Sequence, residues 1–312
     1  MRKFGQKFFF ISAVFALLLY SVDYFIQEGL KTSNYREVSK WNEVIKGGID
    51  AELLIVGSSR ALVHYDCELI EEITGKKCFN LGFDGTLFEH QRLMLDLYLK
   101  NNKAPETLVW NVDYHSFEHS KEFYGFEQLV PYQDQLEVQM LLEANEETDA
   151  LLYQIPVLRY SFNPKMKMVG LLNFFELYET RPALIKGYRK SDKVWDREFD
   201  RFKAKYKEGI SYKVEEQIFA QFSDRLITLI HDKIEVVLVI SPIYYEAKNL
   251  IRNEDQITKR VENLSHEYGF TFLDYSDDSI NYSKDNFYNG THLNKNGVSH
   301  FTKKFALESS KF

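Results

Sequence analysis

The apolar residues of this chain gather in short runs that are bounded by turn residues. Runs of this kind are typical of strands that are buried on both faces of a parallel sheet. The pattern predicts strands at residues 52–57, 78–81, 107–113, 235–240 and 270–274.

Segments with apolar positions at helical spacing alternate with these runs. The spacing predicts helices at residues 61–74, 87–101, 247–268 and 295–309. Strands that alternate with helices indicate βαβ units, with helices on both faces of one sheet. We therefore expect an α/β fold, a three-layer α/β/α flavodoxin-like parallel sheet of about five strands, which binds ligands at the carboxyl ends of its strands.

Residues 115–230 interrupt this alternation. They are rich in aromatic and charged residues, and their periodicity is mostly helical. We interpret them as a helical insertion between the third and fourth strands, which would cap the carboxyl edge of the sheet. The α/β domain with its cap is then expected to extend over residues 31–312.

The first 30 residues have the pattern of a membrane segment. Three basic residues and no acidic residue precede an uncharged run from Phe8 to Val22, which continues to Ile26 after Asp23. A spanning helix needs about 20 apolar residues, and we expect Asp23 to reach the lipid headgroups. The positive-inside rule keeps the N-terminus in the cytoplasm. Residues 1–30 are thus predicted to be an uncleaved signal anchor of a single-pass protein whose C-terminal domain is extracytoplasmic.

The pattern of the first 30 residues also fits two alternatives to an anchor. A cleaved signal peptide would have the same charged start and apolar core, but a small-x-small cleavage site is missing after Leu19. A buried amphipathic helix of a cytoplasmic protein is the other alternative.

Charge and cysteine content exclude several classes of protein. The chain has 39 Lys and Arg against 46 Asp and Glu, a net charge of −7, so it lacks the basic excess of nucleic-acid binding proteins. Two cysteines are too few for a disulfide scaffold or a Cys₄ zinc site. His115 and His119 have the spacing of metal ligands on a helix, but no third ligand is evident. We predict neither a metal nor a cofactor.

Cys67 and Cys78 leave one question open. The extracytoplasmic compartment predicted from the N-terminus permits a disulfide between them. Cys67 lies within the predicted helix 61–74, however, and this helix can hold the two Cα atoms beyond the roughly 7 Å that a disulfide tolerates.

The first polar cluster is Gly57-Ser58-Ser59-Arg60, at the end of the first predicted strand and the start of a helix. A serine there is exposed on a tight turn, and the free N–H groups of a helix N-terminus favour developing negative charge. The same residues also suit an ordinary N-cap turn.

Two further clusters follow the second and third strands. Residues 80–86, from Asn80 through Gly85, form a glycine-containing turn whose N–H groups can serve as oxyanion donors, or which simply needs a positive φ. Asn111 and Asp113 alternate on one face of the third strand, where buried polar side chains need partners.

The fourth cluster precedes the final helix and contains His292 in the sequence NGTHLN, residues 289–294. A histidine there is placed to act as a general base, although Asn and Gly are also common in surface loops. Tyr244, which follows the fourth strand, either lines a substrate cleft or packs in the core. His64 and His90, which follow the first two clusters, are expected on helix surfaces.

The order and spacing of the four clusters resemble the SGNH hydrolases, also called the GDSL esterase/lipase superfamily. In that family a Gly-Asp-Ser block, an Asn-x-Gly-x-x-Gly block, an Asn and an Asp-x-x-His block follow one another. The resemblance implies that Ser59 is the nucleophile, with Ser58 in place of the aspartate. It also implies that Gly85 is an oxyanion donor, since NLGFDG matches the second block, and that His292 is the base.

The resemblance covers residues 50–115 and 232–310, and leaves out the cap and the anchor. The segments VGSSRALVHY, CFNLGFDG and HLNKNGV look like those of a group of membrane-anchored, extracytoplasmic SGNH-like proteins.

Two departures from the family pattern matter. Either Asn111 or Asp113 can occupy the third block, and an aspartate is a poor oxyanion donor unless it is protonated. Asn289 stands where the family has the aspartate that orients the histidine. In serine proteases that change costs about 10⁴ in rate, yet an Asn carbonyl orients the histidine of papain-like proteases. Asp285 would substitute if the loop folds back, so a dyad, a repaired triad and a relic all remain open.

The resemblance implies a membrane-anchored, extracytoplasmic esterase or O-acyltransferase that acts on acyl esters of cell-envelope glycans, or on a small ester, beside a membrane-bound O-acyltransferase. Ser58, Arg60, Asn80 and Tyr244 are candidate substrate-binding residues. Asn289 motivates the alternative, a catalytically silent binding or scaffold module on the same fold that partners a membrane acyltransferase.

Overall fold

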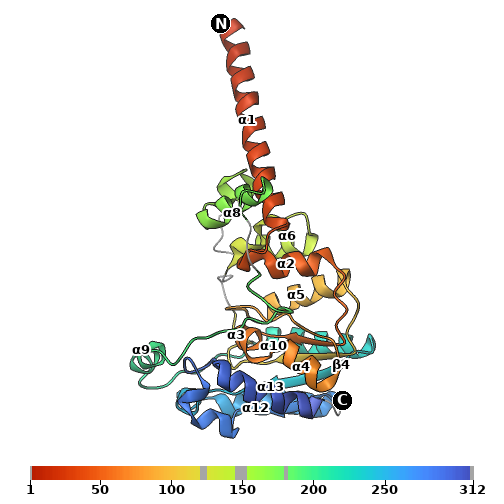
Figure 1. The fold of residues 1–312 in the computed structure, drawn as a ribbon, viewed down its shortest axis with the longest axis vertical. Coiled ribbons are helices and arrows are strands. Elements are labelled where there is room, and N and C mark those ends of the chain that lie inside the picture. Colours follow the sequence, from red (N-terminus) through yellow and green to blue (C-terminus); the bar gives the residue numbers. More distant parts are fainter. Residues whose placement is uncertain (1, 120–124, 145–152, 179–181, 310–312) are drawn as a thin grey trace. The chain divides into compact units, whose positions relative to one another are not determined.

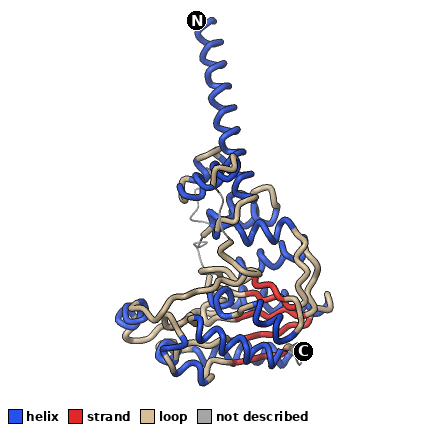
Figure 2. Tube along the Cα trace, viewed as in Figure 1, coloured by secondary structure: helices blue, strands red, loops and turns tan. Residues whose placement is uncertain are grey.

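The computed structural model describes residues 2–119, 125–144, 153–178 and 182–309. These residues form two compact units, which we describe separately. The first consists of Met1–Glu43 with Lys121–Ala183, and the second of Val44–Ser120 with Leu184–Phe312. Figure 1 labels many of the helices and strand β4, and Figure 2 shows that the strands of the second unit lie together in one sheet.

The second unit is built on a five-stranded sheet in the order β2-β1-β3-β4-β5, and every neighbouring pair is parallel. This is the flavodoxin-like order, so the predicted fold class is confirmed. The strands are β1 (Leu53–Val56), β2 (Cys78–Asn80), β3 (Thr107–Asn111), β4 (Glu235–Ile240) and β5 (Thr271–Asp274).

Helices cover both faces of this sheet. Successive side chains of a strand point to opposite faces, and the neighbours Val109 and Trp110 of β3 show what covers each face. Val109 belongs to a core cluster with Phe301 of helix α13 (Lys295–Ser309). On the other face, the ring of Trp110 packs against Phe222 of α10 (Glu216–His231) and Phe88 of α5 (Phe88–Asn101). The helices of this unit are α3 (Ser59–His64), α4 (Cys67–Thr74), α5 (Phe88–Asn101), α9 (Glu198–Lys205), α10 (Glu216–His231), α11 (Tyr245–Lys248), α12 (Glu254–Tyr268) and α13 (Lys295–Ser309), with the 3₁₀ turns η3 (Ser279–Tyr282) and η4 (Lys284–Asn286).

Two of the predicted helices are each broken in two. The predicted helix 61–74 ends at His64, and a second helix begins at Cys67 because the side chain of Asp66 accepts hydrogen bonds from the N–H groups of the new first turn. The predicted helix 247–268 is interrupted between α11 and α12, where the backbone of residues 250–252 hydrogen bonds with Ile210. In both places local capping or pairing overrides the helical spacing.

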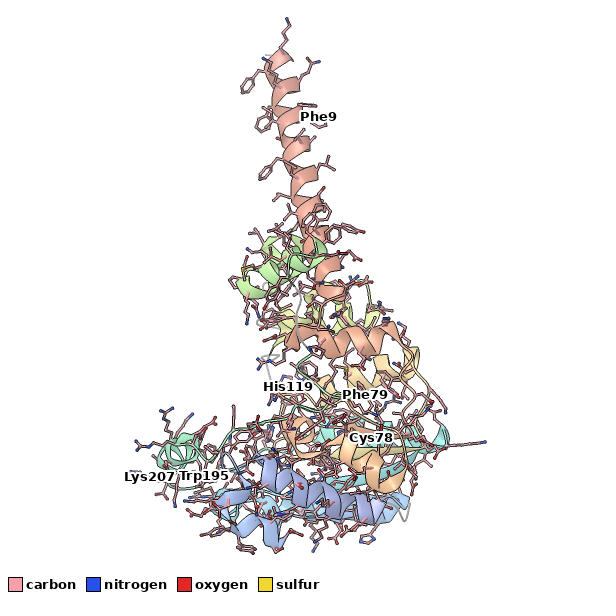
Figure 3. All side chains as sticks on the ribbon, in the orientation of Figure 1. Phe9, Cys78, Phe79, His119, Trp195 and Lys207 are labelled. Carbon is pink, nitrogen blue, oxygen red and sulfur yellow. A yellow bond between two sulfur atoms is a disulfide. The ribbon has the colours of Figure 1, made fainter. Side chains whose placement is uncertain are left out.

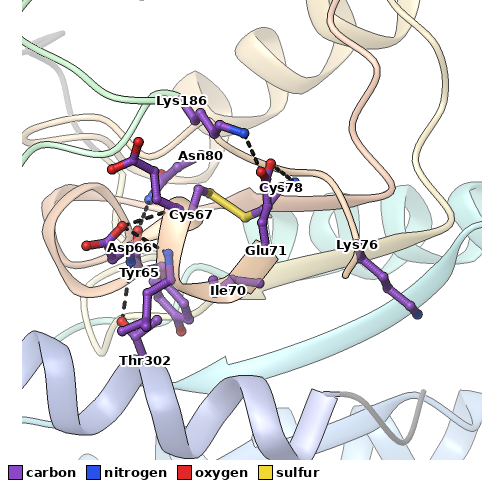
Figure 4. The surroundings of a disulfide bond; sticks show 12 residues. Tyr65, Asp66, Cys67, Ile70, Glu71, Lys76, Cys78, Asn80, Lys186 and Thr302 are labelled. Atoms are coloured by element: carbon purple, nitrogen blue, oxygen red, sulfur yellow. Dashed lines mark hydrogen bonds and ion pairs between the residues drawn. A yellow bond between two sulfur atoms is a disulfide. The ribbon is translucent and has the colours of Figure 1, made fainter. Parts of the chain in front are cut away.

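The break after His64 also explains a disulfide between Cys67 and Cys78, whose Cα atoms lie 5.2 Å apart (Figure 4). Cys67 is the first residue of α4. Gly75, with φ of 73°, ends that helix in the left-handed conformation and turns the chain back, so that β2 begins at Cys78. Cross-linking a loop of about this length stabilises a fold by roughly 3 kcal/mol in the chain-entropy model.

The first unit is helical. It contains α1 (Arg2–Lys31), most of α2 (Arg36–Lys46), η1 (Phe126–Tyr132), α6 (Leu136–Ala144), η2 (Leu158–Tyr160) and α8 (Pro164–Phe174). α1 crosses α8 closely at two glycines: a Cβ on Gly29 would lie 1.8 Å from the carbonyl oxygen of Gly170, and one on Gly170 would lie 2.4 Å from that of Ile26. Only glycine permits this approach.

The N-terminal part of α1 is long and apolar enough to cross a membrane. Its large apolar side chains are exposed, Phe9 for example at 76% (Figure 3), so it is not the buried helix of the soluble alternative. Asp23 differs from the prediction: it is 6% exposed and accepts hydrogen bonds from Nε of Arg159 at 2.9 Å and from the Val157 N–H at 2.7 Å. Its charge is paired within the protein and does not reach for headgroups.

The residues predicted to form a cap are divided between the two units. Residues 125–144 and 153–178 belong with α1, whereas residues 184–230 belong with the sheet. The domain boundaries drawn from the sequence, and the role of residues 115–230 as a cap, stay predictions.

Candidate active site

Ser59 is held at a sharp turn between β1 and α3. Gly57 allows this turn: its φ is 154°, and a Cβ there would lie 2.7 Å from Cβ of Ala61 and 2.9 Å from the carbonyl oxygen of Asn111. Ser58 is the N-cap of α3, and its side chain accepts the Arg60 N–H at 3.3 Å. Ser59 is therefore the first helical residue, half-buried, at the carboxyl end of a central strand.

His292 lies against Ser59, although 233 residues separate them. Its Nε2 is 2.8 Å from Oγ of Ser59. The ring is stacked face to face on Tyr288, with centroids 5.3 Å apart and planes 2° apart. The loop that carries His292 thus brings the fourth cluster to the first, as the order of the motifs predicts.

Asn289 fixes the tautomer of His292. Its Oδ1 accepts the backbone N–H groups of Thr291 at 3.0 Å and of His292 at 2.9 Å, so the oxygen side of the amide must face this loop. The same Oδ1 lies 3.0 Å from Nδ1 of His292. Because an amide oxygen only accepts, Nδ1 carries the proton and Nε2 has a free lone pair for the Ser59 hydroxyl.

Asp285 does not substitute for the missing aspartate. It is exposed in η4. Within the described residues, the hydrogen-bond partners of Nδ1 of His292 are the oxygens of Asn289 and Thr291. The arrangement is therefore Ser-His-Asn rather than a triad repaired by Asp285.

The environment of His292 favours the neutral imidazole. Burial lowers its pKa to about 4; nearby Asp84 opposes this shift, and Arg60 and Arg189 add to it. A histidine with this pKa is unprotonated, and so able to accept a proton, over the whole neutral range.

The second motif places Gly85 beside the Ser59 turn. Phe83 donates its N–H to the carbonyl oxygen of Gly57 at 3.2 Å, and Thr86 Oγ1 donates to the same oxygen at 3.5 Å. Gly85 lies between these two anchors with φ of 66°. Among the hydrogen bonds of the described residues, none engages the backbone N–H of Ser59 or of Gly85. Both remain available as donors to a developing oxyanion.

Asn80 has a structural position. It is fully buried, donates through Nδ2 to the carbonyl oxygens of Ala61 at 2.8 Å and Tyr65 at 3.2 Å, and accepts the Gly82 N–H at 2.8 Å. These bonds tie the end of β2 to α3, and they leave Asn80 no surface for a substrate.

The third motif lies beneath the Ser59 turn as a buried polar network. Arg60 is 4% exposed and Asp113 1% exposed, and Nη1 of Arg60 lies 2.8 Å from Oδ1 of Asp113. Ser58 donates its hydroxyl to the other oxygen of Asp113. Asn111 donates to Asp113 at 3.4 Å and accepts the Tyr65 hydroxyl at 2.9 Å. These side chains satisfy most of one another's buried polar atoms; among the described residues, Nε of Arg60 is buried without a hydrogen-bond partner.

Tyr244 is a core residue in this structure. It is 3% exposed, its ring packs against Trp195 and Phe199, and its hydroxyl donates to Glu246 at 2.9 Å. Of the two positions considered from the sequence, the structure has the one in the core.

His64 and His90 are buried, contrary to the prediction that they lie on helix surfaces. His64 Nδ1 lies 3.0 Å from Ser241 Oγ, and its Nε2 accepts the N–H of Leu293 at 3.1 Å. It therefore supports the residue next to His292. His90 accepts the Leu87 N–H at 3.3 Å. Helical spacing could not reveal this, because these helices are covered on more than one side.

Two residues near the site had no signal in the sequence, and both come from the segment between residues 184 and 215. Arg189 forms a bidentate ion pair with Asp84, in which Nη2 of the arginine lies 2.8 Å from Oδ1 of the aspartate. Glu198 accepts a hydrogen bond from Asn289 Nδ2 at 3.0 Å. Within the described residues, no group of three or more His, Cys, Asp and Glu side chains could hold a metal ion.

No model of a known protein family matches this chain, and no curated protein matches it. It is similar to a solved structure described as "a putative platelet activating factor from Streptococcus pneumonia", with 13% identity and a TM-score of 0.41 over 97% of this chain and 99% of that chain. It is also similar to one described as "a putative acylhydrolase" from Bacteroides fragilis, with 11% identity and a TM-score of 0.39 over 88% of this chain and 96% of that chain. With scores this low, the function proposed below rests on the residues of this chain alone.

Proposed function

We propose that this chain is a serine esterase or O-acyltransferase of the SGNH type. The observation that carries the proposal is the 2.8 Å contact between Ser59 Oγ and Nε2 of His292, in a tautomer that Asn289 holds ready to accept a proton. A serine at a helix N-terminus, a neutral base beside it and free N–H donors nearby are the parts that acyl transfer requires.

The reaction follows from these positions. Ser59 Oγ attacks the carbonyl carbon of an ester while Nε2 of His292 takes its proton, and the carbonyl oxygen becomes an oxyanion that the N–H groups of Ser59 and Gly85 stabilise. The tetrahedral intermediate expels the alcohol, which receives the proton from His292, and an acyl-serine remains. Water then releases the acid, or the hydroxyl group of an acceptor takes the acyl group, with His292 again acting as the base.

Asn111 and Asp113 have a supporting role in this proposal. Oδ1 of Asp113 accepts from Arg60 and its other carboxylate oxygen accepts from Ser58, so this side chain is already engaged and is not placed to hydrogen bond to an oxyanion. Together with Arg60 and Ser58 it holds the turn that presents Ser59, instead of contacting substrate.

We place this activity outside the cytoplasm, on a membrane anchor. The apolar α1 and the basic residues before its apolar run support an anchor with its N-terminus inside. The Cys67–Cys78 disulfide supports an oxidising compartment. We propose that the substrate in this location is an acyl ester of a cell-envelope glycan. A membrane-bound O-acyltransferase is the proposed partner, which would produce this ester or act on the same glycan.

Labelling with a fluorophosphonate, which reacts with activated serines, tests the proposal. The full-length chain in detergent is expected to be labelled, and a Ser59→Ala variant is expected not to be. Ser279→Ala, at a serine of η3, serves as the control and should be labelled like the wild type. Absence of labelling in the wild type, or equal labelling of Ser59→Ala, would contradict the proposal and favour a catalytically silent module.

The acid limb of the pH–rate profile should lie unusually low. Protonated His292 cannot accept the serine proton, so activity is lost as the pH falls through the histidine pKa. With that pKa lowered to about 4, kcat/KM for an acyl ester should stay level down to about pH 5 and halve near pH 4, instead of halving near the ordinary value of about 6.5.

The control for this profile separates titration from unfolding. Each sample is returned to pH 7 after exposure to acid, and recovered activity shows that the chain stayed intact. A reversible half-loss near pH 6.5 would contradict the low pKa of His292.

A further inference from the structure

Asn289 stands beside His292 where the SGNH-type arrangement has an aspartate. A carboxylate, that of Glu198, lies on the far side of Asn289. Asn289 stands between His292 and Glu198: its Oδ1 lies 3.0 Å from Nδ1 of the histidine, and its Nδ2 donates to Oε2 of Glu198 at 3.0 Å. Because two backbone N–H groups also fix the oxygen side of the amide, the amino side can face only Glu198. The structure thus contains a continuous chain of hydrogen bonds from Ser59 to a carboxylate.

Glu198 is held beside Asn289 by contacts of its own. Its backbone N–H donates to Oδ1 of Asp196 at 2.8 Å, and the N–H of Asp196 donates to the carbonyl oxygen of Tyr288 at 3.0 Å. The next residue, Phe199, is packed so tightly on Gly290 that a Cβ there would lie 2.5 Å from the phenyl ring. The start of α9 is therefore attached to the residues on both sides of Asn289.

We propose that Glu198 is a positioning residue, which acts through Asn289 to orient His292 and to supply the negative charge that the SGNH-type arrangement otherwise has on the aspartate. This inference rests on the proposed function. A hydrogen bond to a carboxylate polarises the Asn289 amide and makes its oxygen a stronger acceptor for the Nδ1 proton. The effect is greatest when His292 becomes positively charged in the transition state.

The proposal makes Asn289→Asp a damaging change rather than a repair. The new carboxylate oxygen would replace Nδ2 and face Oε2 of Glu198 at the distance of the present hydrogen bond, 3.0 Å. Two carboxylates at this distance repel each other and compete for one proton. A second change, Glu198→Gln, places an amide donor opposite the new aspartate and removes the repulsion.

Four variants of the full-length chain test this: Glu198→Ala, Asn289→Asp, the double variant Asn289→Asp/Glu198→Gln, and Asp200→Ala as an exposed control on the same helix. Glu198→Ala is expected to lower kcat about tenfold with KM unchanged, because the variant loses the hydrogen bond between Asn289 and a charged carboxylate. Asn289→Asp should lower kcat as well, the double variant should exceed it by at least tenfold, and Asp200→Ala should equal the wild type.

A second readout needs no turnover. With ¹⁵N-labelled histidine, the Nδ1 proton of His292 should move upfield in Glu198→Ala, because its hydrogen bond weakens, and stay in place in Asp200→Ala. Failure of Ser59→Ala to differ from the wild type would overturn the proposed function. The chemical shift of the His292 Nδ1 proton reports on Glu198 whether or not the chain is an esterase. An unshifted proton and an unchanged kcat in Glu198→Ala, or an Asn289→Asp variant more active than the double variant, would overturn the inference.

Discussion

Replacing His292 by alanine is expected to lower kcat for an acyl ester by about 10⁴-fold or more, and replacing Ser59 as well should add almost nothing. The nucleophile and its base act as a unit, so removing either one removes the whole covalent route. The hydroxyl of Ser59 then has no acceptor for its proton at Nε2, where the wild type has one at 2.8 Å. A loss of 10⁴-fold corresponds to about 5.5 kcal/mol of transition-state stabilisation.

The measurement is a comparison of kcat for the wild type, the two single variants and the double variant on one acyl ester. His300→Ala, an exposed histidine of α13, is the matched control and should keep full activity. Losses that multiply in the double variant would show that the two residues act separately, and would contradict the proposed pair.

The sheet could be predicted because four of its five strands are buried almost throughout. β1 is apolar at each position and is completely buried, so its sequence carries the whole signal. The helices were predicted less well. Whether a helix stops after His64 depends on Asp66, a polar cap whose effect outweighs the apolar spacing around it. That break also decided whether Cys67 and Cys78 could pair.

The contact between Ser59 and His292 could be expected from the order of the motifs, since parallel strands bring their carboxyl ends to one edge. The buried network that holds both Asn111 and Asp113 could not be expected, because it depends on the buried charge of Arg60. The contact of Glu198 with Asn289 could not be predicted from the sequence at all. This contact depends on where α9 packs, and neither the charge nor the spacing of residues 184–215 contains that information.

Replacing Arg60 by methionine is expected to lower the free energy of unfolding by about 3–5 kcal/mol, the cost of leaving one charge of a buried ion pair without its partner. Asp113, which is 1% exposed, would then have only Ser58 and Asn111 as side-chain donors. Arg60 also donates to the carbonyl oxygens of Ser241 and Pro242 at the end of β4. Its loss would therefore loosen the turn that presents Ser59 as well.

Urea unfolding of the wild type and variants, followed by tryptophan fluorescence, measures this effect. Arg252→Met is the control, because that arginine is 59% exposed and pairs with an exposed Glu208 at 3.6 Å, and exposed pairs contribute about 0–1 kcal/mol. The double variant Arg60→Met/Asp113→Leu should recover much of the lost stability, since removing both charges leaves none unpaired. An Arg60→Met cost no larger than that of Arg252→Met would contradict the proposal that the buried pair holds the turn.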